Sequence, residues 1–124
     1  MATVKANSTN QENKQIIMDY CPVTYTMAKI GGRWKPLILY NLNEGTKRYG
    51  QLKKSIPGIT EKMLVQHLRE LEADNLIKRD VKPVVPPHVE YSLTNSGRSL
   101  SPLLNEMAEW GRVNGHAFGD VNPM

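Results

Sequence analysis

The stretch IPGITEKMLVQHLRELEADN, residues 56–75, decides the fold of this chain. A Pro-Gly pair turns the backbone, and Thr60 is a preferred N-cap, which predicts a helix that begins directly after it. Asn75 can adopt the left-handed conformation that often ends a helix. We therefore predict a capped amphipathic helix over about residues 60–74. One narrow stripe of it should face a core: Leu64, Leu68 and Leu71.

The segments around this helix predict a simple order of elements. Three short helices are expected before it, over residues 22–30, about 36–44 and 49–55. After it, a β-hairpin is expected over about 77–93, because apolar and polar residues alternate over 88–93; its connection PVVPP is too rich in proline for a tight turn. A last helix is expected over about 95–114, in which Pro102 either bends the helix or begins its main segment.

Three helices, a tight turn, a helix, a two-stranded ribbon and a helix form the order of a winged helix-turn-helix domain. We expect a mainly α fold with a small β-ribbon over residues 16–115, between an N-terminal tail, 1–15, and a C-terminal tail, 116–124. In such a domain the 60–74 helix is the recognition helix and the 77–93 hairpin is the wing.

Composition and charge narrow the class of protein. The 124 residues are 40% hydrophobic and 23% charged, as in one globular domain, and no apolar run or leader pattern predicts a membrane span or export. With a single cysteine, we expect a cytoplasmic protein. From Lys29 to Lys82 there are 12 Lys and Arg against 6 Asp and Glu, a net charge of +6. The rest of the chain has 4 against 6, a net charge of −2, which gives +4 for the whole chain. A basic middle is typical of modules that bind polyanions.

The sequence has no catalytic or metal-binding motif. His67, His88 and His116 fall on separate segments without the spacing of a zinc site. The glycine pair at 31–32 follows a helix, the reverse of a phosphate-binding loop. We therefore expect neither an enzyme nor a metal or cofactor site.

The face of the 60–74 helix opposite its leucines is polar. At 100° per residue, Lys62, Gln66 and Arg69 fall within about 40° of the direction opposite Leu64. In the major groove of DNA, Lys and Arg suit guanine O6 and N7, and Gln suits adenine N6 and N7. Val65, at the border of the stripe, can contact a thymine methyl group. We predict that these four residues read base edges.

Flanking residues supply the expected contacts to phosphates and to the groove beside the wing. These are Arg48, Lys53, Lys54, Thr60, Arg79, Lys82 and His88. If about five groups per subunit neutralise phosphates, the logarithm of affinity should fall with the logarithm of salt concentration at a slope of about −4 to −5 per subunit.

Three blocks of the sequence together resemble the HxlR-type winged-helix regulators of bacteria: CPVTYTMAKIGGRWKPLIL, RYGQLKKSIPGITEKMLVQHLRELEADNLIKR, and VVPPHVEYSLTNSGRSL followed by EWG. The resemblance runs from about Cys21 to Gly111. It implies a dimeric, cytoplasmic, DNA-binding transcription regulator, often a repressor, whose N- and C-terminal helices form the dimer interface. The chain departs from the family at Asn75, where glycine is usual, at His88, where arginine is frequent, and at Arg33, where lysine is usual.

The last helix predicts a dimer independently of the resemblance. Its apolar face is wider than a small domain can easily cover, and an uncovered face of that kind points to a partner surface. Two recognition helices related by a twofold axis would read a palindromic operator in double-stranded DNA. The expected interface residues are Leu100, Leu103, Leu104, Met107 and Trp110.

Cys21 stands directly before a helix, where the helix dipole favours a thiolate. The resemblance implies that some relatives sense oxidants or electrophiles through a cysteine at this position; the alternative is a purely structural residue. Two other hypotheses remain open. The regulator can instead bind a small effector at the dimer interface, in a pocket lined by Met27, Trp34 and Met107. Alternatively, the winged helix binds protein in place of DNA.

Overall fold

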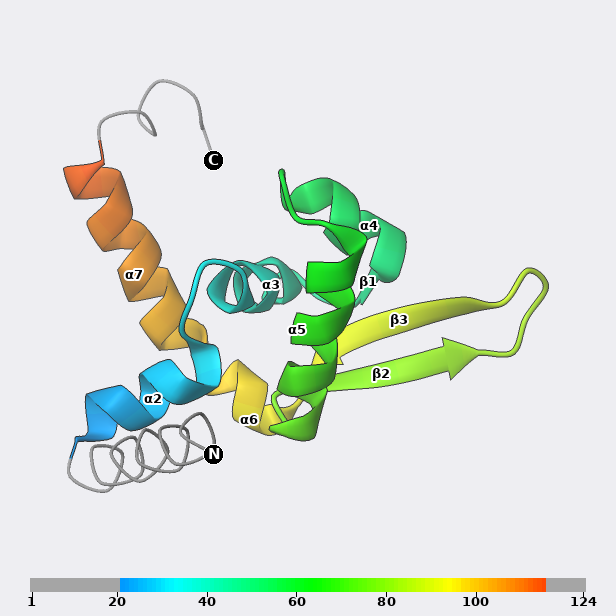
Figure 1. Cartoon of the computed structure of the whole chain (residues 1–124), viewed down its shortest axis with the longest axis horizontal. Coiled ribbons are helices and arrows are strands. Elements are labelled where there is room, and N and C mark those ends of the chain that lie inside the picture. Colours follow the sequence, from blue (N-terminus) through cyan, green and yellow to red (C-terminus); the bar gives the residue numbers. More distant parts are fainter. Residues whose placement is uncertain (1–20, 116–124) are drawn as a thin grey trace, which may run out of the picture.

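The computed structural model describes residues 21–115 of the chain, and Figure 1 shows how its helices and strands are arranged. The predicted tails, 1–15 and 116–124, and residues 16–20 of the predicted domain lie outside the described residues. The elements are α2 (Pro22–Ile30), α3 (Lys35–Leu42), β1 (Lys47–Arg48), α4 (Tyr49–Ser55), α5 (Glu61–Ala73), β2 (Ile77–Lys82), β3 (His88–Leu93), α6 (Asn95–Arg98) and α7 (Ser101–Asn114).

The ends of α5 confirm the local signals in the sequence. The hydroxyl Oγ1 of Thr60 accepts a hydrogen bond from the backbone N–H of Met63 at 3.1 Å, which caps the first turn. Gly58, in the turn before it, has a φ of +87°, a conformation that favours glycine. At the other end, Asn75 has a φ of 60° and so ends the helix in the left-handed conformation. These contacts fix where α5 starts and stops.

The hydrophobic core lies where α3, α4 and α5 meet the sheet. The predicted leucine stripe of α5 faces this core, so the opposite face of the helix is left to solvent. The largest fully buried side chains are Ile38, Leu39, Leu42, Leu52, Ile56, Leu64, Leu68, Leu71 and Ile77. Burying side chains of this size stabilises the fold by about 1.5–3 kcal/mol each, so α5 is held firmly against the domain.

The sheet has three antiparallel strands in the order β1-β3-β2, one more than the expected two-stranded ribbon. The additional strand, β1, is two residues long, and its Lys47 lies opposite Tyr91 of β3. Two residues cannot show a period of alternation, which is why the sequence pattern did not reveal this strand. Because α4 begins directly after β1, the strand anchors the start of the helix-turn-helix on the wing.

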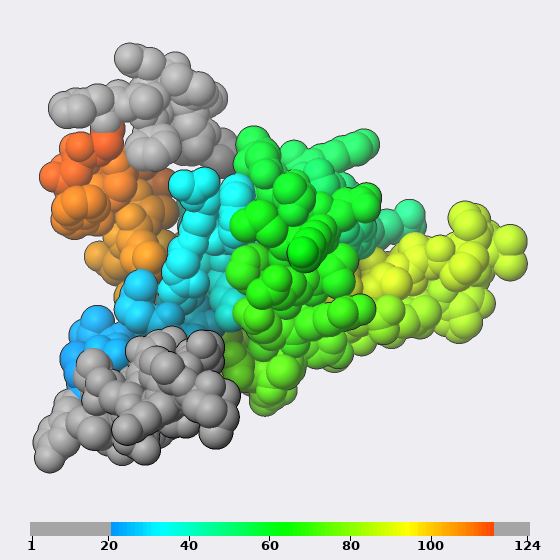
Figure 2. Space-filling model, viewed as in Figure 1, coloured from blue at the N-terminus to red at the C-terminus, as the bar shows by residue number. Residues whose placement is uncertain are grey.

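The hairpin of β2 and β3 extends away from the helices (Figures 1 and 2). Its strands pair from Ile77 with Leu93 to Lys82 with His88. The five-residue connection carries Val85, whose side chain is 98% exposed. The predicted wing is therefore present, and its tip stands clear of the domain.

The segment after the wing forms two helices, which settles the role of Pro102. Thr94 caps the short helix α6 by accepting from the N–H of Gly97 at 3.0 Å. A Cβ on Gly97 would lie 2.0 Å from the carbonyl oxygen of Leu76, so the close approach of α6 to the start of β2 requires glycine. The main helix, α7, starts at Ser101, and Pro102 lies in its first turn, where its missing N–H costs nothing.

Leu104 was expected on the dimer face but is buried in its own domain. Its side chain is 3% exposed and belongs to the core of its own domain, and Leu100 packs partly buried against the same core. The two residues are four apart and share one side of the chain, which faces inward. Leu103, Met107 and Trp110 are exposed by 41%, 46% and 70%, and with Val113 they are the large apolar side chains that α7 exposes.

Candidate nucleic-acid interface

The helix pair α4 and α5 presents the polar face of α5 to solvent. Figure 2 shows the green atoms of α5 on the open surface of the molecule, next to the base of the yellow hairpin. Lys62, Gln66 and Arg69 are exposed, and Val65 is half-buried, as the helical period predicts. Within the described residues 21–115, neither Lys62 nor Arg69 has a carboxylate within 4.0 Å. Their charges are therefore available to an external polyanion.

A shallow depression follows this face and brings in residues that the sequence analysis did not select. The lining residues are Tyr49, Glu61, Lys62, Val65, Gln66, Arg69 and Glu70. Tyr49, at the start of α4, is half-buried beside the reading face. Burial, and then the nearby Glu61 carboxylate, raise the pKa of Tyr49, so its hydroxyl stays protonated and able to donate.

Of the four residues predicted to read bases, only Gln66 has a polar side-chain contact within the described part of the chain, and its partner is Glu70. The amide Nε2 of Gln66 donates to Oε2 of Glu70 at 3.2 Å. The other carboxylate oxygen of Glu70 lies 2.7 Å from Nζ of Lys35, at the start of α3. A Gln and a Glu four residues apart are neighbours on a helix surface, so the spacing alone could have revealed the first contact.

The predicted phosphate contacts lie on both sides of α5. Lys54 and Arg48 are exposed and Lys53 is half-buried, all at or next to α4. Arg79 is exposed on β2. Among the described ion pairs, none involves these four residues. The hydroxyl of Thr60 accepts the capping bond and keeps its own proton free to donate.

The two other wing residues are held by carboxylates of the wing itself. Nζ of Lys82 lies 2.9 Å from Oδ2 of Asp80 and 3.9 Å from Oε1 of Glu90. Nε2 of His88 lies 2.9 Å from Oε2 of Glu90. The hydrogen bond to Asp80 is the main cause of the raised pKa of Lys82. Because Lys82 and Arg79 are an odd number of residues apart on one strand, they point to opposite faces of the ribbon.

An apolar surface lies on the opposite side of the molecule from the wing, on α2 and α7 (Figure 1). It combines the exposed face of α7 with apolar side chains of α2. We call this set the α2/α7 face; its exposed residues are Val23, Met27, Leu103, Met107, Trp110 and Val113. Val113 and Val23 are exposed by 73% and 70%, more than the expected members Leu103 and Met107.

Cys21 is the N-cap residue of α2, two positions before Val23, and is half-buried. Its thiol makes no capping hydrogen bond. The Thr24 hydroxyl, followed by the backbone N–H groups of Thr24 and Val23, nevertheless lowers the pKa of Cys21. A lowered pKa increases the thiolate fraction, which is the form that reacts with oxidants and electrophiles.

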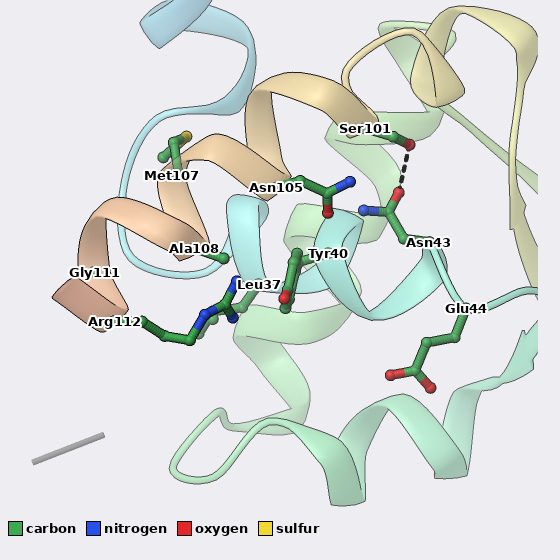
Figure 3. A pocket seen from close by; sticks show the side chains of 10 residues that line it. All are labelled: Leu37, Tyr40, Asn43, Glu44, Ser101, Asn105, Met107, Ala108, Gly111 and Arg112. Atoms are coloured by element: carbon green, nitrogen blue, oxygen red, sulfur yellow. Dashed lines mark hydrogen bonds between the residues drawn. The ribbon is translucent and has the colours of Figure 1, made fainter. Parts of the chain in front are cut away.

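A groove with a volume of about 980 Å³ lies between α3 and α7 (Figure 3). Met107 lines it, but the other two residues of the expected ligand pocket, Met27 and Trp34, do not. Trp34 instead packs partly buried against the core. The Nδ2 atom of Asn43 is buried without a hydrogen-bond partner, while its Oδ1 accepts from the hydroxyl of Ser101 at 2.7 Å.

Over residues 21–115, no helix is long and apolar enough to cross a membrane. No group of three or more His, Cys, Asp or Glu side chains in that range could hold a metal ion.

The fold and the exposed face of α5 define this molecule as a winged helix-turn-helix domain. Residues 29–117 match the model of the HxlR-like helix-turn-helix family, and the chain belongs to that family. It is a helix-turn-helix transcription regulator, in agreement with its relatives.

Three similar proteins illustrate the relationship. The regulatory protein MalR of Fusobacterium mortiferum is 53% identical over 95 residues, which cover 76% of this chain and 90% of MalR. The HTH-type transcriptional regulator YybR of Bacillus subtilis is 48% identical over 94 residues, which cover 76% of this chain and 75% of YybR. The redox regulator HypR in its oxidised form is 46% identical with a TM-score of 0.75, covering 78% of this chain and all of HypR.

Proposed function

We propose that this protein is a dimeric, sequence-specific repressor that binds a palindromic operator in double-stranded DNA in the cytoplasm. The observation that carries the proposal is the exposed face of α5, on which Lys62 and Arg69 have no carboxylate within 4.0 Å among the described residues. The N-terminal part of α5 enters the major groove, and Lys62, Val65, Gln66 and Arg69 read base edges. Arg48, Lys53, Lys54 and Thr60 contact phosphates beside it, and Arg79 does so from the wing.

The α2/α7 face supports the dimer. Exposed apolar side chains gathered on two helices of a small domain mark an interaction site, and a second copy related by a twofold axis would cover the same face on both molecules. The pair then places two α5 helices in successive turns of the major groove. Lys82 and His88, which are held by Asp80 and Glu90, contribute less to phosphate binding than Arg79.

Footprinting on DNA upstream of the protein's own gene tests the proposal, with affinity measured at several salt concentrations. We expect a protected palindrome and a log–log salt slope of about −4 to −5 per subunit. Arg69→Ala should weaken operator binding by about 5- to 150-fold, as expected for one lost bidentate base contact. An affinity that ignores ionic strength would refute DNA binding. Unchanged function after alanine substitution of Lys62, Gln66 and Arg69 would favour a protein-binding module.

We further propose that Cys21 makes the regulator responsive to oxidants or electrophiles. The lowered pKa of Cys21, its position at the N-terminus of α2 and the similarity to the redox regulator HypR support this role. An adduct at Cys21, or a disulfide to the partner's copy, would change how the two recognition helices are spaced. Operator binding titrated with diamide should respond in the wild type and not in Cys21→Ser. The same response in both proteins would remove Cys21 from the mechanism.

A second candidate mechanism is a non-covalent effector in the groove between α3 and α7. It is favoured by the buried amide nitrogen of Asn43, because an unpaired buried donor is a natural partner for an acceptor atom of a ligand. The substitution Ala108→Trp would fill this groove. If induction in cells persists in Cys21→Ser and is lost in Ala108→Trp, this mechanism holds and the covalent one fails.

A further inference from the structure

Two carboxylates, Glu61 and Glu70, line the depression on the face that is proposed to meet DNA. Glu70 lines the same depression as Lys62, Gln66 and Arg69, and 43% of its side chain is exposed. A carboxylate at this position repels phosphates and lowers the affinity of the surface for DNA. A favourable role of Glu70 must therefore come from its contacts within the protein.

The two oxygens of Glu70 have different partners. Oε1 lies 2.7 Å from Nζ of Lys35, whose side chain is only 12% exposed, so the ion pair ties α3 to the middle of α5. Oε2 accepts the hydrogen bond from Nε2 of Gln66 at 3.2 Å. The contact with Lys35, and then that with Gln66, lower the pKa of Glu70, so the carboxylate is ionised at neutral pH. An ionised carboxylate can only accept hydrogen bonds.

This restriction fixes the orientation of the Gln66 amide. A glutamine amide can rotate by half a turn and exchange the places of its oxygen and nitrogen. Next to an acceptor-only carboxylate, the nitrogen must face Glu70. One amide hydrogen is then used by Glu70, while Oε1 and the second amide hydrogen remain free. An oxygen acceptor beside an N–H donor is the pair that matches N6–H and N7 of adenine.

We propose that Glu70 is a positioning residue, which holds the Gln66 amide in the orientation that recognises adenine before DNA is bound. Lys35 in turn holds Glu70 from α3. Fixing a side chain in its binding conformation in advance lowers the entropy that binding must remove. The proposal rests on the proposed function, because it assumes that α5 reads bases in the major groove.

The first test selects binding sites from a pool of random-sequence DNA duplexes. Wild-type protein should select adenine at one position of each half-site, and Gln66→Ala should lose that preference. Glu70→Gln should reduce the adenine preference about tenfold, which is within the range for one bidentate contact. A glutamine at position 70 can donate or accept, so it no longer fixes the amide of Gln66.

Glu72→Gln is the matched control. Glu72 is exposed on the same helix and has no side-chain partner among the described contacts, and its substitution removes the same charge. It lies six positions, or about 240°, around the helix from Gln66. Both variants should gain similar affinity for non-specific duplex, while only Glu70→Gln loses adenine preference. Lys35→Arg preserves a cation for Glu70 and should keep the preference.

The second test needs no DNA. In NMR spectra of the free protein, one of the two side-chain amide protons of Gln66 should shift as Glu70 is titrated with acid. That pH-dependent shift should be absent in Glu70→Gln and present in Glu72→Gln. A role of Glu70 in packing alone would not couple its titration to a single amide proton of Gln66.

The outcomes separate this inference from the function on which it rests. Full adenine preference in Glu70→Gln, or a Gln66 amide that ignores the titration of Glu70, would overturn the inference. If Gln66→Ala selects the same sites as the wild type, the inference fails while sequence-specific binding stands. If the wild type selects no sequence at all, both the proposed function and the inference fail.

Discussion

Helix α5 and the C-terminal helix α7 have nearly the same length, 13 and 14 residues, and both are amphipathic. They use their apolar faces differently. The leucine stripe of α5 is fully covered by the rest of the domain, whereas the one buried residue of α7 is Leu104. Trp110 of α7 is 70% exposed. The apolar face of α5 is covered by its own domain and leaves the polar face open, whereas the open apolar face of α7 is the surface proposed to meet a second copy.

The largest expected effect is on stability, and it compares the same substitution, leucine to alanine, on the covered face of α5 and on the open face of α7. Leu68 of α5 is 2% exposed and Leu103 of α7 is 41% exposed. Leu68→Ala should lower the free energy of unfolding by about 2–5 kcal/mol, because it removes buried methyl groups and leaves a cavity. Leu103→Ala should cost much less in the isolated domain. Urea denaturation of both variants, at a concentration where the protein is monomeric, measures the contrast; equal losses would contradict it.

The second prediction concerns the open face of α7. Trp110→Glu places a charge in the centre of the proposed dimer contact and should weaken association by about 2 kcal/mol or more, as expected for an aromatic hot spot. Sedimentation at several concentrations measures the dimer dissociation constant. Val85→Glu at the wing tip, where the side chain is 98% exposed, is the control for adding the same charge. A Trp110→Glu protein that dimerises as tightly as the control would remove α7 from the interface.

A smaller effect is expected at the start of α5. Thr60→Ala removes the hydroxyl that accepts the N–H of Met63 and should lower the free energy of unfolding by about 1 kcal/mol. Thr60→Ser should retain most of that stability, because serine can accept the same bond. Thermal unfolding of the two variants separates a role in capping from a role in DNA contact. Equal stability of wild type and Thr60→Ala would show that the cap contributes nothing.

The smallest effect is a pH dependence at Glu70. Its pKa in the folded protein is lowered, chiefly by Lys35, from an ordinary value of 4.5. A lowered pKa means that the carboxylate stabilises the fold above pH 4.5 and that this contribution is lost as the pH falls through the lowered pKa. The wild type should therefore be slightly more stable than Glu70→Gln at neutral pH, and the difference should shrink in acid. A difference that grows with acidity would contradict the sign.

The sequence predicted the elements with strong local signals. The bounds of α4 and α5, the cap at Thr60, the left-handed Asn75 and the helix that begins at Pro22 are all confirmed. Each depends on contacts between residues at most a few positions apart. The outward face of α5 was predictable for the same reason, because the helical period places a side chain once its neighbours are known.

Features that depend on distant residues were missed. Strand β1 exists because Lys47 and Arg48 lie beside β3, more than 40 residues later in the chain. The assignment of Leu104 to the dimer face overlooked that α7 needs one side to pack on its own domain. Trp34, one of the three residues expected to line a ligand pocket, packs partly buried against the core through contacts with distant residues.

The sequence by itself determined where helices begin and end and which of their faces are apolar, because caps, turns and helical periods act over a few residues. Only the tertiary structure decided which apolar faces are covered and which charges are neutralised. Lys35 meets Glu70 across 35 residues of chain, while Lys62 and Arg69 are left without a carboxylate partner in the described structure. Such pairings arise from the packing of whole elements, so no local pattern encodes them.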